Sequence, residues 1–188
     1  MNVTIAHIAL GSNAASPFGP PSATVRAALS ALGRTVGRLR AQSRLFINPA
    51  VPEGAGPDFV NAIAALETTL APVILLERLH ALEAQFGRHR QVRWGPRTLD
   101  LDLIDVAGAV LPDRETWQAW RDLPPLDRPV RAPGRLVLPH PRLQDRAFVL
   151  IPLADVAPDW RHPVEGRSVG EMLAALSAAE REAVKPLP

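Results

Sequence analysis

One segment near the middle of the chain, RWGPRTLDLDLID at 93–105, constrains the fold more than any other. Leucine alternates with aspartate from Leu99 to Leu103, and successive side chains of a β-strand point to opposite faces of its sheet. The leucines therefore share one face, and Asp100 and Asp102 share the other. The alternation predicts a strand whose apolar face packs on a core and whose other face carries two carboxylates.

The remaining elements are expected on both sides of this strand. Apolar and β-branched residues predict strands at 3–10, 39–47 and 58–70, and helical spacing predicts helices at 22–39 and 72–86. The resulting order, β-α-β-β-α-β, predicts the α+β class, as a ferredoxin-like sandwich with an antiparallel sheet and both helices on one face. Added C-terminal elements, including a short helix near 168–183, are expected to follow.

Length and composition limit the classes of protein. The 188 residues predict a single domain, 1–188, in which the proline-punctuated segment 112–134 is a surface insertion. No apolar run approaches the roughly 20 residues of a membrane span, and the first residues lack the pattern of a signal peptide. Zero cysteines exclude disulfides and thiolate metal sites. We therefore expect a cytoplasmic protein that makes no membrane contact.

Arginine dominates the positive charge. The net charge is only +2 while the sequence pI is about 10.3, and Lys185 is the sole lysine. So small an excess indicates nucleic-acid binding only weakly. The guanidinium forks are better read as groups suited to phosphate.

The aspartate pair is the strongest candidate for chemistry. Asp100 and Asp102, about 7 Å apart at Cα, can converge on one hard cation or bracket two, and oxygen ligands favour Mg²⁺. Alternatively, they lie on the solvated face of an amphipathic strand. Like charges on one strand face call for a counter-charge, and four arginines lie just upstream: Arg88, Arg90, Arg93 and Arg97. Arginine forks with Mg²⁺ are typical of a polyphosphate clamp.

Four further residues each allow two interpretations. Phe59 and Asn61 share a strand face and suit a flat heterocycle, or are a core Phe and a turn Asn. His80 and Glu83 share a helix face, which either is solvated or reaches the same cleft.

The Arg-rich loop and the later chain offer more candidates. Trp94 either packs or contacts a nucleotide. Arg135, Arg146 and Phe148 add two cations and an aromatic ring. His140, between two prolines, either makes a structural hydrogen bond or contacts a ligand.

Six short motifs occur in the order IALGSN, PDFVNA, GR-x-R, RWGPRTLDLDLI, LPHP and DRAFVL. In these motifs, over about residues 3–160, the chain resembles the 6-hydroxymethyl-7,8-dihydropterin pyrophosphokinase (HPPK) family of folate biosynthesis. The resemblance implies transfer of pyrophosphate from ATP to the pterin hydroxymethyl group, giving AMP and the pterin diphosphate. It implies ATP as co-substrate and two Mg²⁺ ions.

The resemblance also implies a role for each candidate. The catalytic set would be Arg88, Arg97, Asp100 and Asp102, with the two aspartates holding Mg²⁺. The phosphates would contact Arg88, Arg90, Arg97 and His140, with Arg135 and Arg146 in support. The nucleoside would border His80, Glu83 and Leu103, and Trp94 would order a closing loop. Phe59 and Phe148 would sandwich the pterin, and Asn61 would hydrogen-bond its edge.

The chain departs from the family pattern at several positions. Asn48 replaces a hydroxyl residue, Phe59 a tyrosine and His80 a glutamine, and 91–92 stand for a longer charged stretch. An RNA-binding ferredoxin-like module and an inactive relative are the alternatives. We expect small-molecule substrates, no nucleic acid and a monomer.

Overall fold

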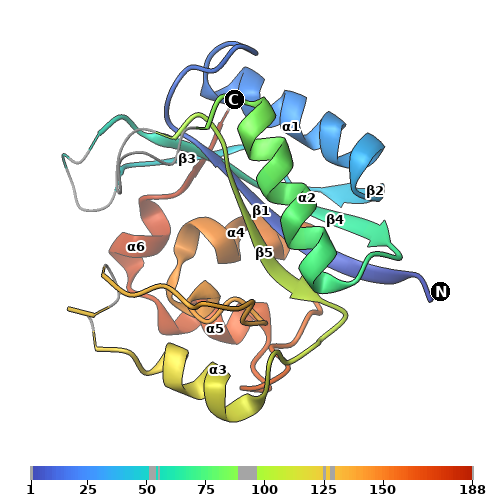
Figure 1. Ribbon diagram of the computed structural model, residues 1–188. Coiled ribbons are helices and arrows are strands. Elements are labelled where there is room, and N and C mark those ends of the chain that lie inside the picture. Colours follow the sequence, from blue (N-terminus) through green and yellow to red (C-terminus); the bar gives the residue numbers. More distant parts are fainter. Residues whose placement is uncertain are drawn as a thin grey trace.

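The computed structural model describes residues 2–50, 54, 56–88, 97–124, 126–127 and 130–187 (Figure 1). The strands are β1 (Thr4–Ser12), β2 (Arg38–Gln42), β3 (Phe46–Asn48), β4 (Phe59–Thr68), β5 (Asp100–Val106) and β6 (Lys185–Pro186). The helices are α1 (Pro21–Thr35), α2 (Pro72–Gln85), α3 (Arg114–Arg121), α4 (Ala147–Val156), α5 (Val169–Ala175) and α6 (Ala178–Glu182), with a 3₁₀ turn at Leu143–Asp145. Within these ranges, no helix is long and apolar enough to cross a membrane.

The strands form one antiparallel sheet. Its order is β5-β1-β4-β3-β6, and β2 also pairs with β4. This is the predicted βαββαβ arrangement, except that the expected single strand at 39–47 is two strands. The interruption has a local cause: Ser43 binds the backbone of Ile63 through both its N–H and its Oγ, so residues 43–45 leave the regular ladder.

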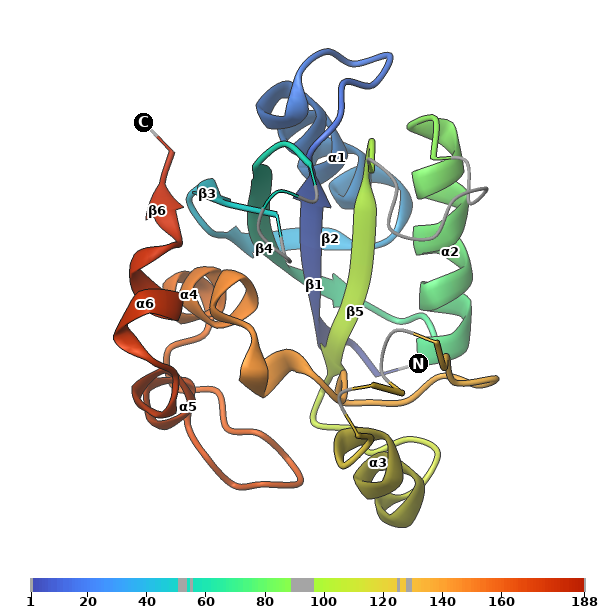
Figure 2. The same ribbon diagram turned by 90° about the vertical axis from the view of Figure 1, so that its left-hand side faces the viewer.

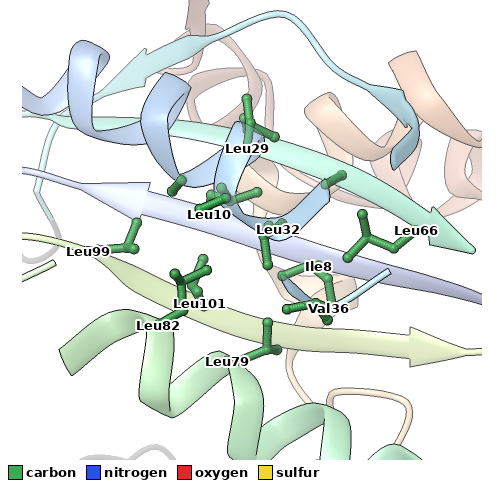
Figure 3. Close-up of a cluster of buried hydrophobic side chains, with 14 of the residues drawn as sticks. Ile8, Leu10, Leu29, Leu32, Val36, Leu66, Leu79, Leu82, Leu99 and Leu101 are labelled. Atoms are coloured by element: carbon green, nitrogen blue, oxygen red, sulfur yellow. The ribbon is translucent and has the colours of Figure 1, made fainter. Parts of the chain in front are cut away.

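Both predicted helices lie on one face of the sheet, as expected (Figure 1). The apolar side chains of α1 and α2 meet those of β1 and β5 in a single buried cluster (Figure 3). Proline at the start of each helix is tolerated, because the first N–H groups of a helix have no intrahelical partner. This packing fixes Leu99, Leu101 and Leu103 toward the helices, and therefore turns the aspartates between them to the opposite face.

The opposite face is covered only in part. Val149, Leu150 and Leu153 of α4 pack with Ile63 of β4 and Ile104 of β5, and Figure 2 shows α4, α5 and α6 gathered beside this face. The expected helix at 168–183 is two helices, because Ser177 begins a new capping box after Ala175.

Part of the segment 112–134 is a helix with a buried anchor. Helix α3 begins after Asp113, whose carboxylate accepts a hydrogen bond from the N–H of Thr116. Trp117 is fully buried, and its indole N–H donates to the Pro139 carbonyl at 2.8 Å. Helix α3 is thereby fastened to the LPHP motif. The interpretation of the whole segment as a surface insertion stays a prediction.

Candidate functional site

The aspartate pair lies where the alternation predicts. Asp100 and Asp102 are half-buried on the sheet face away from α1 and α2, and Leu101 between them is buried on the other side. In the register, Asp100 lies beside Gly11 of β1, which lies beside Asn61 of β4. The carboxylates and the carboxamide therefore belong to one surface built from three neighbouring strands.

Arginines flank Asp100 on both sides. Arg88, just after α2, reaches Asp100 at 2.6 Å and also pairs with Glu83, while Arg97 pairs with the other oxygen of Asp100. Arg88 and Asp100 expose only 17% and 18% of their side chains, so water screens this network weakly. The counter-charges that the pair calls for are present.

Glu83 has a second partner on the strand. Its Oε1 accepts a hydrogen bond from the N–H of Leu101 at 2.8 Å, and its side chain is buried. Glu83 thus orients Arg88 and caps the edge of β5 at the same time. His80, one helical turn earlier on α2, is exposed and lines the cleft described below.

Asp102 has a different environment. Its side chain is 39% exposed, and its carboxylate lies 3.5 Å from the Arg146 guanidinium. Arg146 in turn lies over the Phe148 ring, 5.6 Å from its centroid. The two aspartates are therefore unequal: Asp100 is held by two arginines, and Asp102 by one longer contact.

A second group surrounds Gly11. A Cβ added to Gly11 would lie 3.0 Å from the Asn61 Oδ1, 3.8 Å from the Phe59 ring and 4.0 Å from the Asp100 Cβ. The Nδ2 of Asn61 donates to Asn48. Glycine thus leaves an open floor between an aromatic ring, an amide oxygen and a carboxylate. In the sequence Gly11 is only one residue of the IALGSN motif, and the cross-strand register is the signal that identifies it as this floor.

A cleft of about 690 Å³ adjoins Asp102. Its lining includes the candidates His80, Asp102, Leu103, Arg135, His140 and Arg146, which the sheet and α2 bring together. It also includes residues that the sequence did not single out: Leu76, Trp120, Leu123, Arg131 and Arg142. A second hollow of about 430 Å³, beside Gly37 and Arg38, contains none of the candidates.

His140 enters the cleft as a neutral donor. Its Nδ1 accepts a hydrogen bond from the N–H of Arg142 at 3.1 Å, so its hydrogen resides on Nε2. Burial of the ring, and next the charges of Arg146 and Arg142, lower the pKa of His140 to about 3. At pH 7 the ring is therefore uncharged and can donate one hydrogen bond.

Arg135 and Phe148 have further surroundings of their own, and the remaining candidates lie outside the described residues. Arg135 is exposed and contacts the Thr116 hydroxyl at 3.3 Å and Asp113 at 4.0 Å. Phe148 is half-buried on α4. Arg90 and Trp94 lie outside the described residues, as do Arg93 and the altered positions 91–92.

The aspartate pair fits a magnesium site shared with a ligand. Within the described ranges, no group of three or more His, Asp or Glu could hold a metal alone. Two carboxylates on one strand face suit Mg²⁺, which keeps several waters and takes its remaining ligands from substrate phosphates. The adjoining arginines and the neutral His140 are donors for such phosphates.

Comparison with known proteins identifies the chain. A family model described as 7,8-dihydro-6-hydroxymethylpterin-pyrophosphokinase (HPPK) matches residues 7–158. On a fold with this charged cleft, the match indicates the class of pyrophosphokinases, which are transferases. The protein named 2-amino-4-hydroxy-6-hydroxymethyldihydropteridine pyrophosphokinase in Pseudomonas aeruginosa is 45% identical over 170 residues, 90% of each chain. The chain therefore belongs to the HPPK family.

Further relatives agree with this assignment. The protein of the same name in Methylorubrum extorquens is 36% identical over 184 residues, 97% of this chain and 100% of that one. A crystal structure of a Plasmodium falciparum HPPK-DHPS triple mutant matches with a TM-score of 0.64 at 12% identity. That match covers 92% of this chain but only 44% of the solved chain, and it shows a shared fold.

Proposed function

We propose that this protein transfers pyrophosphate from ATP to the hydroxymethyl group of 6-hydroxymethyl-7,8-dihydropterin, releasing AMP and the pterin diphosphate. This is the activity of folate biosynthesis to which the family name refers. The observation that carries the proposal is the arrangement around Asp100. Two arginines pair with Asp100, and Asp102 lines the cleft. The open floor at Gly11, between Phe59 and Asn61, adjoins Asp100.

Magnesium is proposed to occupy the aspartate pair together with ATP. Asp100 and Asp102 would hold two Mg²⁺ ions, which would neutralise phosphate charge and polarise the attacked phosphoryl group. The arginines that pair with Asp100 would exchange this carboxylate for phosphate oxygens. We therefore expect Mg²⁺ and ATP to bind as one unit.

The phosphates are proposed to contact Arg88, Arg97, Arg146 and His140. Three guanidinium groups supply charge-assisted hydrogen bonds, and the Nε2–H of His140 adds a neutral donor whose hydrogen is fixed by the contact at Nδ1. A neutral imidazole at this place has a consequence. Its Nδ1 lone pair already accepts the Arg142 N–H, so the ring can act on a phosphate oxygen only as a donor.

The pterin is proposed to lie over Gly11. Because the Nδ2 of Asn61 is engaged by Asn48, its Oδ1 remains to accept a hydrogen bond from an amino or ring N–H group of the pterin. Phe59 and Phe148 would contact the faces of the ring. The hydroxymethyl group would then point toward Asp100, which lies beside Gly11 on the neighbouring strand.

Catalysis in this arrangement depends on position and charge. A primary alcohol attacks the β-phosphorus in line with the leaving AMP oxygen, and no covalent enzyme intermediate is required. Holding both substrates in one geometry and neutralising the developing charge with arginines lower the barrier. The described residues supply both functions.

The test is to mix the protein with ATP, Mg²⁺ and 6-hydroxymethyl-7,8-dihydropterin and to follow the adenine nucleotides. AMP that forms only when the pterin is present supports the proposal, and ADP would contradict it. Asp102→Asn is the negative control. If wild type gives no pterin-dependent AMP, RNA binding and an inactive relative become the candidates to test.

We also propose a cytoplasmic monomer that contacts neither nucleic acid nor a membrane. The absence of cysteine in the 188 residues agrees with a reducing compartment. Light scattering behind a sizing column measures the oligomeric state, and a dimer mass would contradict the proposal.

A further inference from the structure

The segment 112–134 contributes to the cleft that contains Asp102. Trp120, Leu123 and residues 131–134 line the same cleft as Asp102 and Arg146. Figures 1 and 2 show α3 beyond the C-terminal end of β5, whereas Asp102 lies near the beginning of that strand. Trp120 of α3 therefore lines the cleft from the side of the C-terminal end of β5.

Trp120 is held in this position by the packing of α3. Trp117 and Trp120 are three residues apart and share a face of the helix. Trp117 is buried and bonded to the Pro139 carbonyl, and Trp120 packs against the cluster of Trp117, Val137 and Val164 while it stays half-buried. The backbone that carries Trp120 is thus fastened to the motif that carries His140.

The apolar part of the cleft lining does not suit phosphate. The cleft combines cations and a carboxylate with apolar side chains, namely Val73, Leu76, Leu103, Trp120, Leu123 and Leu136. A polyphosphate gains nothing from apolar surface, whereas a nucleoside presents a flat, largely apolar base. The volume of about 690 Å³ lies within the range typical of pockets for molecules of this size.

We propose that Trp120 and Leu123 contact the nucleoside of ATP, so that the insertion sets part of the affinity for the nucleotide. This inference rests on the proposed function, because it places the phosphates at Asp102, Arg146 and His140. The Arg131 guanidinium lies over the Trp120 ring, 5.6 Å from its centroid. Arg131 therefore occupies one ring face that a base could take.

The test compares two ligands that differ in the nucleoside. Calorimetry measures the binding of α,β-methylene-ATP and of inorganic tripolyphosphate, each with Mg²⁺. Trp120→Ala removes an aromatic ring on which the base could stack, so this variant should bind the ATP analogue at least about fivefold more weakly than wild type does. Binding of tripolyphosphate should change by less than about twofold, because no described contact of Trp120 concerns phosphate.

Matched variants complete the design. Trp120→Phe keeps an aromatic face and should recover most of the lost affinity. Leu126→Ala, which removes an exposed apolar side chain of the same segment outside the cleft lining, should bind both ligands like wild type. Leu123→Ala replaces Trp120→Ala if circular dichroism shows that the latter is unfolded.

The outcomes separate this inference from the proposed function. Unchanged binding of the ATP analogue, or an equal loss for both ligands, overturns the role of Trp120. If either result is found while wild type still forms AMP from ATP and the pterin, the proposed function is supported and only the role of Trp120 is rejected. If wild type neither binds the analogue nor forms AMP, both proposals fail.

Discussion

Asparagine substitutions at the two aspartates should separate catalysis from stability. Asp100→Asn and Asp102→Asn both remove a carboxylate charge while nearly keeping the shape of the side chain. If the pair holds Mg²⁺ against the phosphates, each variant should lose at least about 100-fold in turnover. The rate of pterin-dependent AMP formation measures this loss.

The effects on folding should differ between the two positions. Asp102 exposes 39% of its side chain and has one ion pair at 3.5 Å, so Asp102→Asn should change the free energy of unfolding by only about 0–1 kcal/mol. Asp100 joins two arginines in a weakly hydrated network. Asp100→Asn should therefore cost about 1–3 kcal/mol.

Urea denaturation followed by circular dichroism gives these free energies, and AMP formation gives the turnover from the same preparations. Asp159→Asn makes the same chemical change at an exposed position and should alter the stability by less than about 0.5 kcal/mol. Turnover of Asp102→Asn above about a tenth of the wild-type rate would refute the metal role. Equal destabilisation by Asp100→Asn and Asp102→Asn would refute the analysis of the ion pairs.

Three further variants test other parts of the structure. Gly11→Ala brings a Cβ to 3.0 Å from the Asn61 Oδ1, so the KM for the pterin should rise about tenfold or more in initial-rate assays while binding of the ATP analogue is unchanged. Trp117→Phe removes the hydrogen bond to the Pro139 carbonyl, and urea denaturation should show a loss of about 1–2 kcal/mol. Burial lowers the pKa of His162 to about 4, so between pH 6.5 and 4 the unfolded chain takes up a proton at this residue that the folded chain does not. The contribution of His162 to the free energy of unfolding should therefore fall by at most about 1.4 kcal/mol per pH unit, and His162→Gln should make the pH dependence of stability less steep by that amount.

The sequence predicts those features that depend on local periodicity. The Leu/Asp alternation correctly gives the faces of β5, because the period of a strand is independent of its partners. The βαββαβ order is likewise confirmed. The break at residues 43–45 is missed, because it arises from hydrogen bonds between Ser43 and Ile63, residues that are distant in sequence. Helix α4 is also missed, since Pro152 lies inside an apolar run that lacks a polar face.

In the candidate site, too, the sequence predicts local features and misses those that depend on tertiary contacts. Motif spacing identifies Asp100, Asp102 and the arginines, but it leaves open which arginine contacts which carboxylate. That Gly11, Asn61 and Asp100 lie side by side can be known only from the register of three paired strands. Trp120 is missed because its place in the cleft depends on the burial of Trp117, which α3 alone does not reveal.

The outer edge of β5 has a consequence for handling the protein. Strand β5 ends the sheet order, and an open strand edge invites pairing with another chain and then aggregation. Here the Leu101 N–H is taken by Glu83 and the Ile104 carbonyl accepts from the N–H of His140, both at 2.8 Å. Glu83 and the backbone of His140 thus occupy polar groups of this edge that another strand would otherwise pair with. Poor solubility of Glu83 variants would then report an unprotected sheet edge, separately from any effect on ligand binding.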